Sequence, residues 1–332
     1  MSGRTRKKGE AKRPTLAHRA EYVMARALES LVSTLPEGAA DRLGAGVGGL
    51  VGGPLGIRRS TVEANLRLAY PDTSDEWIRE TSRAAYRHLG REATAILRLS
   101  RLDPEAIVAR TEPHGWDELH AALDEGNGAI LVTGHYGNWE IAAATVASRG
   151  LPIAAIVKRM GNPLVDARLE ELRQRLGVET IETGDAPRQV PRVLRAGGVV
   201  GIVADQDARR TGVFVPFFGR PASTHRGPAL FALRLDAPVF ACTARRKPGP
   251  GVRYVVSGHR VPVRRTGDLE ADVTHLTREL AAALEADVRG APEQYFWFHR
   301  RWKTAPPPEP TDAQDGTREE RDGTILPTGD LA

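Results

Sequence analysis

The chain has 332 residues, 41% of them hydrophobic and 27% charged, and this balance excludes a largely disordered protein. The formal net charge of +5 favours an anionic partner, such as nucleic acid, an acidic carrier protein or an anionic membrane surface, without choosing among them. The single cysteine, Cys242, excludes an internal disulfide, and its apolar neighbours predict a buried strand residue rather than a nucleophile.

The N-terminal region combines a basic arm with apolar segments. Residues 1–15 are rich in Lys and Arg and lack the apolar core of a secretory signal, so we expect a disordered arm. Residues 16–35 have the apolar spacing of an amphipathic helix, and 43–57 is apolar but short and interrupted by Pro54. Neither segment suits a bilayer-spanning helix. We expect 16–57 to face a membrane, or to form a helical pair packed on the domain.

The rest of the chain predicts an α/β fold. Residues 75–125 have a helical pattern, and beyond them short apolar runs alternate with helical stretches, which is typical of buried strands in a sheet. We expect strands at 128–134, 153–157, 199–204 and 238–243, an edge strand at 253–257, and helices at 138–149, 162–176, 186–197 and 268–289. The sequence therefore predicts a central mixed β-sheet surrounded by helices, in one domain over 16–304, with a disordered tail at 305–332.

His135 directly follows the apolar strand at 128–134, at the end where α/β sheets bind ligands. Asn138 is a good helix N-cap and puts Glu140 in the first turn of the next helix. A loop followed by a helical turn can bring Glu140 back to the imidazole Nδ1–H, leaving Nε2 free as a base. The free N–H groups near Gly137 and Asn138 offer an oxyanion site. The alternative is a histidine that merely ends a strand, with Glu140 in an ordinary first-turn position.

Four blocks of sequence carry a family resemblance over about residues 20–304. The run GHYGNWE at 134–140 resembles the H-x-x-x-x-[DE] motif of the lysophospholipid acyltransferase superfamily, and within it the chain is similar to the late lipid A acyltransferases. The further blocks are KRMGNP at 158–163, with Arg173 after it, then DQD at 205–207 with GVFVPFFG at 212–219, and finally APEQYFWFHRRWK at 291–303.

The resemblance implies a lysophospholipid acyltransferase-like fold and an O-acyltransferase in which His135 is the general base and Glu140 orients it. Arg173 and Asp205 match further positions that the family needs for activity. With Lys158, the side chains of Arg159 and Arg173 would suit the phosphates of a lipid headgroup.

The implied donor is acyl carrier protein or a coenzyme A thioester, which is a substrate, so no cofactor and no metal are expected. The implied acceptor is a lipid A precursor, with a phosphatidylinositol mannoside or a lysophospholipid as alternatives. We expect a peripheral or monotopic protein on the cytoplasmic face of the inner membrane, although many members have a more hydrophobic N-terminus.

Other interpretations stay open at this point. Asp205 and Asp207 could hold a divalent metal for a glycosyltransferase, or fix a loop through Arg209 or Arg210. Arg173 could form a plain surface ion pair, and residues 213–218 could be a core strand or a flap lining an acyl channel. The aromatic and basic segment 295–303 favours a membrane interface, and nucleic acid, which we do not expect as a partner, would use a similar mixture. A membrane-bound scaffold without activity is the non-enzyme alternative.

Overall fold

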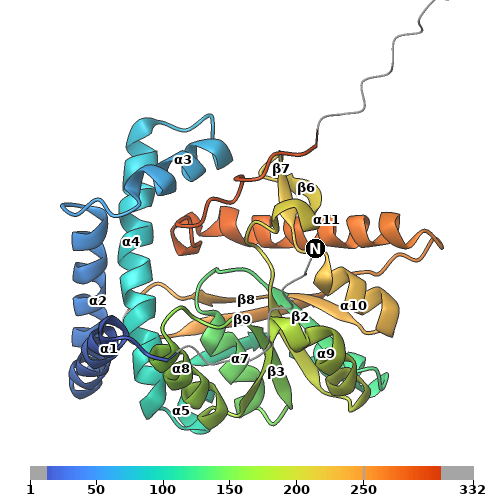
Figure 1. The fold of residues 1–332 in the computed structure, drawn as a ribbon, viewed down its shortest axis with the longest axis horizontal. Coiled ribbons are helices and arrows are strands. Elements are labelled where there is room, and N and C mark those ends of the chain that lie inside the picture. The colour runs from blue at the N-terminus through green and yellow to red at the C-terminus, as the bar shows by residue number, and fades with distance from the viewer. Residues whose placement is uncertain (1–12, 250, 308–332) are drawn as a thin grey trace, which may run out of the picture.

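The computed structural model describes residues 13–249 and 251–307, so most of the arm expected at 1–15 and of the tail expected at 305–332 lies outside the described residues. In the described part the fold is α/β, as predicted, with a seven-stranded mixed sheet between two layers of helices (Figure 1). Short 3-10 turns lie at Leu99–Arg101, Thr183–Asp185, Arg209–Thr211 and Pro292–Gln294.

The strand order is β1-β9-β8-β2-β5-β3-β4, and neighbouring strands are parallel except for β8 and β9. The strands are β1 (Thr111–His114), β2 (Ala129–Thr133), β3 (Ile153–Val157), β4 (Val178–Glu182), β5 (Val199–Val203), β8 (Val239–Arg246) and β9 (Tyr254–Arg260). The edge predicted at 253–257 is wrong, because β9 lies between β8 and β1. The real edge, β1, is only four residues long and lies inside the stretch that the pattern predicted to be helical.

Alternating residues of the strands point to two different hydrophobic clusters. Leu131 of β2 packs with α6 (Trp116–Asp124) and α7 (Trp139–Ser148), and α8 (Pro163–Arg175) lies beside α7. Its neighbours Ile130 and Val132 pack on the opposite face. That face is covered by α9 (Ala186–Arg195), α10 (Gly227–Leu235) and α11 (Leu269–Gly290). The sheet is therefore buried on both faces, as its apolar strands require.

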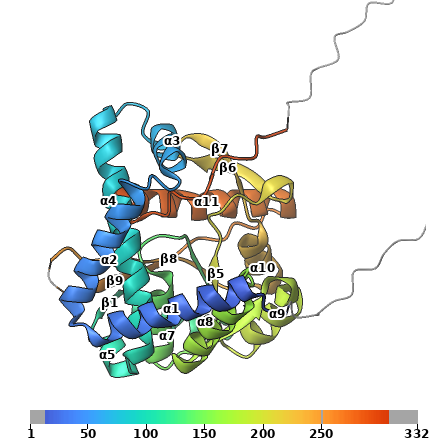
Figure 2. The ribbon, with the colours of Figure 1, turned by 60° about the vertical axis from the view of Figure 1, so that its left-hand side comes forward.

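The N-terminal helices form a layer at one end of the sheet. They are α1 (Leu16–Thr34), α2 (Glu37–Gly52), α3 (Arg59–Ala69), α4 (Asp75–Arg98) and the short α5 (Pro104–Val108). Figure 2 shows α1 lying across α8, where Asn162 Nδ2 donates to His18 O (2.9 Å) and Arg168 pairs with Glu29 (2.5 Å). The helices thus pack on the domain. Among the helices of the described residues, none combines the length and the apolarity needed to cross a bilayer.

Helices α2 and α4 approach so closely that only glycine fits between them. A Cβ atom on Gly48 would lie 2.0 Å from the carbonyl oxygen of Tyr86, and one on Gly90 would lie 2.0 Å from that of Gly44. By contrast, a Cβ on Gly46, in the same helix, would meet no atom within 4 Å.

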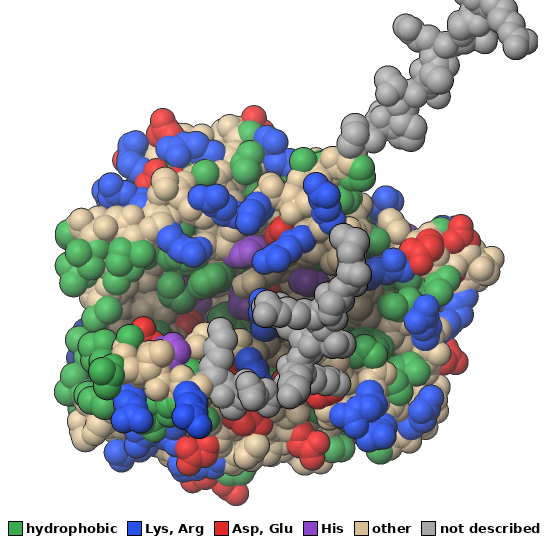
Figure 3. Space-filling view, in the orientation of Figure 1, with side chains coloured by type: hydrophobic (Ala, Val, Ile, Leu, Met, Phe, Trp, Pro, Cys, Tyr) green, Lys and Arg blue, Asp and Glu red, His purple; other side chains and the backbone are tan. Residues whose placement is uncertain are grey.

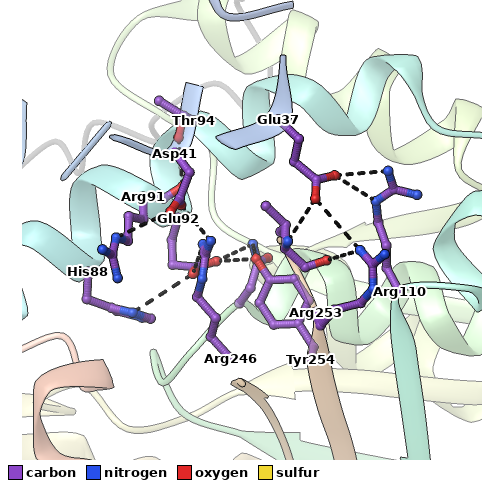
Figure 4. A network of polar contacts seen from close by, with 12 residues as sticks. Glu37, Asp41, His88, Arg91, Glu92, Thr94, Arg110, Arg246, Arg253 and Tyr254 are labelled. Atoms are coloured by element: carbon purple, nitrogen blue, oxygen red, sulfur yellow. Dashed lines mark hydrogen bonds and ion pairs between the residues drawn. The ribbon is translucent and has the colours of Figure 1, made fainter. Parts of the chain in front are cut away.

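A buried polar network joins these helices to the sheet (Figure 4). The carboxylate of Glu92 on α4 accepts hydrogen bonds from Arg246 (3.0 Å), Tyr254 OH (2.7 Å) and Asn138 Nδ2 (2.8 Å). Arg246 also pairs with Asp41 of α2 (2.5 Å). Because a buried charge is stable only when it is paired and hydrogen-bonded, the network fixes α2 and α4 relative to the strands.

The segment 213–218 belongs to the core. Residues Val213–Phe217 form β6, which pairs with β7 (Arg220–Thr224) in a separate hairpin beside α11. Val215 and Phe217 are fully buried, which confirms the core strand and not the flap. The membrane-interface interpretation of 295–303 is wrong for the same reason. Its Tyr295, Trp297 and Phe298 are buried, and Arg301 donates to Ser223 O and Thr224 Oγ1 (both 2.6 Å).

The close packing of α2 on α4 gives a first test. Gly48→Ala should lower the free energy of unfolding by about 2 kcal/mol, because its Cβ overlaps the α4 backbone. Gly46→Ala adds the same methyl group in open space and should leave stability unchanged or raise it by up to ~1 kcal/mol. Denaturant unfolding of both variants measures the difference, and equal stabilities would contradict the packing.

Candidate active site

His135 lies at the carboxyl end of β2, in a loop that the C-terminal segment holds in place. Phe296 N–H donates to His135 O (2.9 Å), and Gly137 N–H donates to Gln294 O (3.0 Å). Gly137 has a φ of +58°, and a Cβ there would lie 1.9 Å from Ala244 O, so only glycine fits. The block at 291–303 therefore acts as a brace that fixes the backbone around His135.

Asn138 is the N-cap of α7, as predicted. Its Oδ1 accepts the N–H of Ile141 (2.9 Å), while its Nδ2 donates to the buried carboxylate of Glu92 (2.8 Å). The polar network of Figure 4 thus reaches the loop that carries His135 and fixes where α7 begins.

The imidazole of His135 is hydrogen-bonded to Asp205, with 2.7 Å between Nδ1 and Oδ1. The parallel pairing of β2 and β5 explains this contact, because Thr133 lies opposite Val203 in the register. His135 and Asp205 each follow two residues later, so both side chains reach the same edge of the sheet. The rings of Trp139 and Phe296 flank the imidazole at centroid distances of 4.8 and 5.8 Å.

The electrostatics of this pair suit a base. Burial by itself would lower the pKa of His135, but the charge and hydrogen bond of Asp205 outweigh it and raise the pKa above its ordinary value of 6.5. Burial would likewise raise the pKa of Asp205, yet the imidazolium and the hydrogen bond hold that pKa below its ordinary value. With Asp205 on Nδ1, the other nitrogen, Nε2, is left to accept a proton from a ligand.

The expected contact between Glu140 and His135 is wrong. The first turn of α7 directs Glu140 toward α8, where Arg173 donates hydrogen bonds to both oxygens of its carboxylate, from Nε (2.9 Å) and Nη2 (2.5 Å). Both side chains are largely buried, so this is an internal ion pair rather than the surface pair considered as the alternative for Arg173. The acid that orients the imidazole comes from the next strand of the sheet instead of from the same loop.

The expected oxyanion site at Gly137 and Asn138 is also wrong. Gly137 N–H donates to Gln294 O, and Asn138 N–H donates to Ala244 O (3.0 Å), so both donors are occupied within the protein. The side-chain amide of Gln206 is a polar group beside the free nitrogen of the imidazole, with 3.5 Å between Gln206 Nε2 and His135 Nε2.

The three basic residues expected at a phosphate site do not gather there. Arg159 is exposed and pairs with Glu182, away from the cavity wall, whereas Arg173 is engaged by Glu140. Lys158 and Arg173 both line the cavity, but the charge of Arg173 is neutralised by Glu140, so of the three only the exposed Lys158 adds an unpaired positive charge there, beside Arg209 and Lys303.

The acids at 205–207 are engaged in different contacts. Asp205 bonds His135, and Asp207 Oδ2 accepts from Thr304 Oγ1 (2.9 Å), with neither Arg209 nor Arg210 involved. The backbone N–H of Asp207 donates to His299 Nε2 (3.0 Å), which joins this loop to the C-terminal brace. Among residues 13–249 and 251–307, three or more His, Cys, Asp or Glu side chains do not gather as a metal-ligand set.

Next to His135 is a cavity of about 960 Å³, whose mouth appears in Figure 3 as a hollow among Lys and Arg side chains. Its lining comes from the sheet and helices α6, α7 and α8, and also from the first turns of α9 and α10. Its walls are mainly apolar and include Leu131, Ala143, Val146, Ile153, Ala155, Val178, Val203, Phe240 and Val256. Cys242 lines it as a strand residue, and burial raises the pKa of this thiol to about 12, so it is not an activated nucleophile.

Sequence comparison gives a family and relatives that cover most of the chain. The profile of a family described as "Bacterial lipid A biosynthesis acyltransferase" matches residues 11–304. A phosphatidylinositol mannoside acyltransferase of Mycolicibacterium smegmatis is 28% identical over 282 residues, which are 82% of this chain and 88% of that protein.

Two proteins of Escherichia coli are similar over comparable lengths. A lipid A biosynthesis lauroyltransferase is 28% identical over 280 residues, covering 83% of this chain and 89% of the relative. A lipid A biosynthesis palmitoleoyltransferase is 27% identical over 272 residues, covering 80% and 85%.

Asp205→Asn and Glu140→Gln make the same chemical change at the two candidate partners of His135. Removing the Asp205 charge should lower the pKa of His135, because burial then dominates and disfavours the imidazolium. Glu140→Gln should lower it less, since Glu140 contributes weakly and pairs with Arg173. NMR titration of the imidazole measures both shifts. A shift in Glu140→Gln as large as that in Asp205→Asn would contradict the assignment of the partner.

Proposed function

Since the chain belongs to the bacterial lipid A biosynthesis acyltransferase family and is an O-acyltransferase acting on a glycolipid, we propose that His135, held by Asp205, is its catalytic base. The donor is a fatty acyl thioester of acyl carrier protein, with coenzyme A as the alternative carrier. The acceptor is a hydroxyl of a lipid A precursor or related glycolipid, with phosphatidylinositol mannosides and lysophospholipids as alternatives. The observation that carries the proposal is the 2.7 Å contact between His135 and Asp205 beside a large apolar cavity.

The reaction proceeds in two bond-changing steps. Nε2 of His135 takes the proton of the acceptor hydroxyl as its oxygen attacks the thioester carbonyl carbon. The tetrahedral oxyanion then collapses, the carbon–sulfur bond breaks, and the imidazolium returns its proton to the leaving thiolate. Asp205 keeps the imidazole oriented and stabilises the imidazolium, so no covalent acyl-enzyme and no cofactor or metal is required.

The remaining site residues have supporting roles in this proposal. The pair of Glu140 and Arg173 forms part of the cavity wall beside His135 and holds α7 to α8. Lys158, Arg209 and Lys303 supply positive charge for an acidic carrier protein or for phosphates. The apolar wall receives the fatty acyl chain, because hydrocarbon is favoured where water is excluded.

The proposed location is the cytoplasmic face of the inner membrane, with the protein attached peripherally. Helices α1 and α2 leave a row of large apolar side chains exposed on the outside of the molecule, and Figure 3 shows hydrophobic surface at that end. The row comprises Leu16, Val23, Met24, Leu28, Leu31, Val47 and Leu50. Arg19 and Arg26 lie exposed on the same helix as the first five. Apolar and basic side chains together favour an anionic bilayer surface.

An acyl-transfer assay tests the reaction. Labelled acyl carrier protein and acyl coenzyme A are each offered with a lipid A precursor, a phosphatidylinositol mannoside and a lysophospholipid. His135→Ala should lower the rate on the active acceptor by about 10²–10⁴-fold. Folding of the variant is checked by circular dichroism. A folded His135→Ala protein with near-normal turnover would rule out the role of His135, and a wild-type protein inactive with both donors on all acceptors would contradict the proposed substrates.

Sedimentation with anionic vesicles tests the membrane surface. Val23→Glu with Met24→Glu should weaken vesicle binding by about 10-fold or more, because burying one large apolar side chain contributes about 1.5–3 kcal/mol. Ala271→Glu with Ala282→Glu adds the same two negative charges at exposed positions of α11 and serves as the matched control. Equal binding of the α1 double variant and the control would contradict this docking face.

A further inference from the structure

The wall of the large cavity changes character along the sheet. At the level of Leu131 in β2, the register places Phe240 of β8 on one side and Gly201 of β5 on the other. Ala155 of β3 lies next to Gly201 at the same level. All four line the cavity. Along this level of the sheet, the large side chains of Phe240 and Leu131 are followed by Gly201, which has no side chain, and then by Ala155, which has only a methyl group.

Gly201 is unusual for its place in the fold. It stands in the middle of β5, a parallel strand between β2 and β3 that reads Val-Val-Gly-Ile-Val. Such strands are usually continuous in Val, Ile and Leu, and a glycine within one weakens it unless another backbone or a ligand must approach.

Packing does not account for this glycine. A Cβ on Gly201 would meet only Ile153 Cδ1 at 3.7 Å and Ala155 Cα at 3.9 Å, which are ordinary contacts. Gly198, just before the same strand, is different, because a Cβ there would lie 2.9 Å from Val193 Cγ1. Gly201 keeps space open toward the cavity, whereas Gly198 is needed for close packing.

The strand residues that surround the space over Gly201 all have apolar side chains. Val203, Ala155, Ile153 and Val178 line it, and the small Ala143 of α7 is also in the cavity wall. Ile153 and Val178 are themselves buried and lie at the amino ends of their strands, at the end of the cavity away from His135. In the direction of β9 the lining is mixed, because Val256 and Trp116 are apolar whereas Ser257 and the exposed His114 are polar. An acyl chain matches the first direction better than the second.

We propose that Gly201 determines the acyl-chain specificity of this enzyme, by leaving the gap over β5 through which the chain passes to Ile153 and Val178. This inference rests on the proposed function, since it concerns the acyl donor of the same reaction. A larger side chain at this position shortens the channel, and the enzyme then prefers shorter chains than the wild type does.

The experiment compares donors of one carrier with lauroyl, myristoyl and palmitoyl chains. In Gly201→Val, the ratio of kcat/KM for the longest accepted chain to that for the shortest should fall by about 15-fold, if about two methylene groups lose their burial at ~0.8 kcal/mol each. Gly201→Ala should move the ratio in the same direction by a smaller factor. If Gly201→Val does not fold, Gly201→Ala alone tests the inference, because its Cβ makes only ordinary van der Waals contacts.

Gly258→Ala, whose Cβ would lie 3.1 Å from Cys242 Sγ, is the matched change in the other direction of the cavity. A preference shifted by Gly201 variants and unchanged in Gly258→Ala supports the inference. Unchanged preference in folded Gly201 variants, or a shift found only in Gly258→Ala, overturns it while leaving the proposed function intact. A wild-type protein that transfers no chain from any donor would instead contradict the proposed function, and this inference with it.

Discussion

The parallel pairing of β2 with β5 is the constraint on which the site depends. Their register sets Thr133 opposite Val203, and His135 and Asp205 follow each strand by the same two residues. Two groups 70 positions apart in the chain thereby come within 2.7 Å. Much of the surrounding structure keeps this edge in place. The brace at 291–303 binds the backbone at His135 and Gly137, and the network around Glu92 fixes the start of α7.

The sequence predicted the architecture well, because apolar runs and helical periodicity are local signals. Strands β2, β3, β5 and β8 and helices α7, α8, α9 and α11 lie where the pattern indicated. The sequence pattern does not predict the short strand β1, because its four residues, which include Pro113, show no alternation of apolar and polar side chains. With β1 missing, β9 was mistaken for the edge. Segment 295–303 was misread because large aromatic residues beside Arg and His have the same composition in a buried cluster as at a membrane interface.

The local sequence also indicates the position of the base, but it does not indicate which carboxylate is the partner of that base. A histidine after a buried strand, followed by an N-cap, indicates His135 from the sequence alone. Glu140 is the nearest carboxylate in the chain, and spacing cannot show that the first turn of α7 directs it to Arg173. Asp205 follows its own apolar strand just as His135 does, and this shared position was the available signal. Only the strand order, with β5 beside β2, turns that similarity into a contact.

The pH dependence of acyl transfer tests most directly whether His135, held by Asp205, is the base. The account predicts that kcat/KM falls on the acid side as one group becomes protonated, with a midpoint above 6.5, because the pKa of His135 is raised. Transfer is then fastest where the imidazole is neutral. A kcat/KM that does not change with pH on the acid side, or one that falls with a midpoint at or below 6.5, would contradict the account.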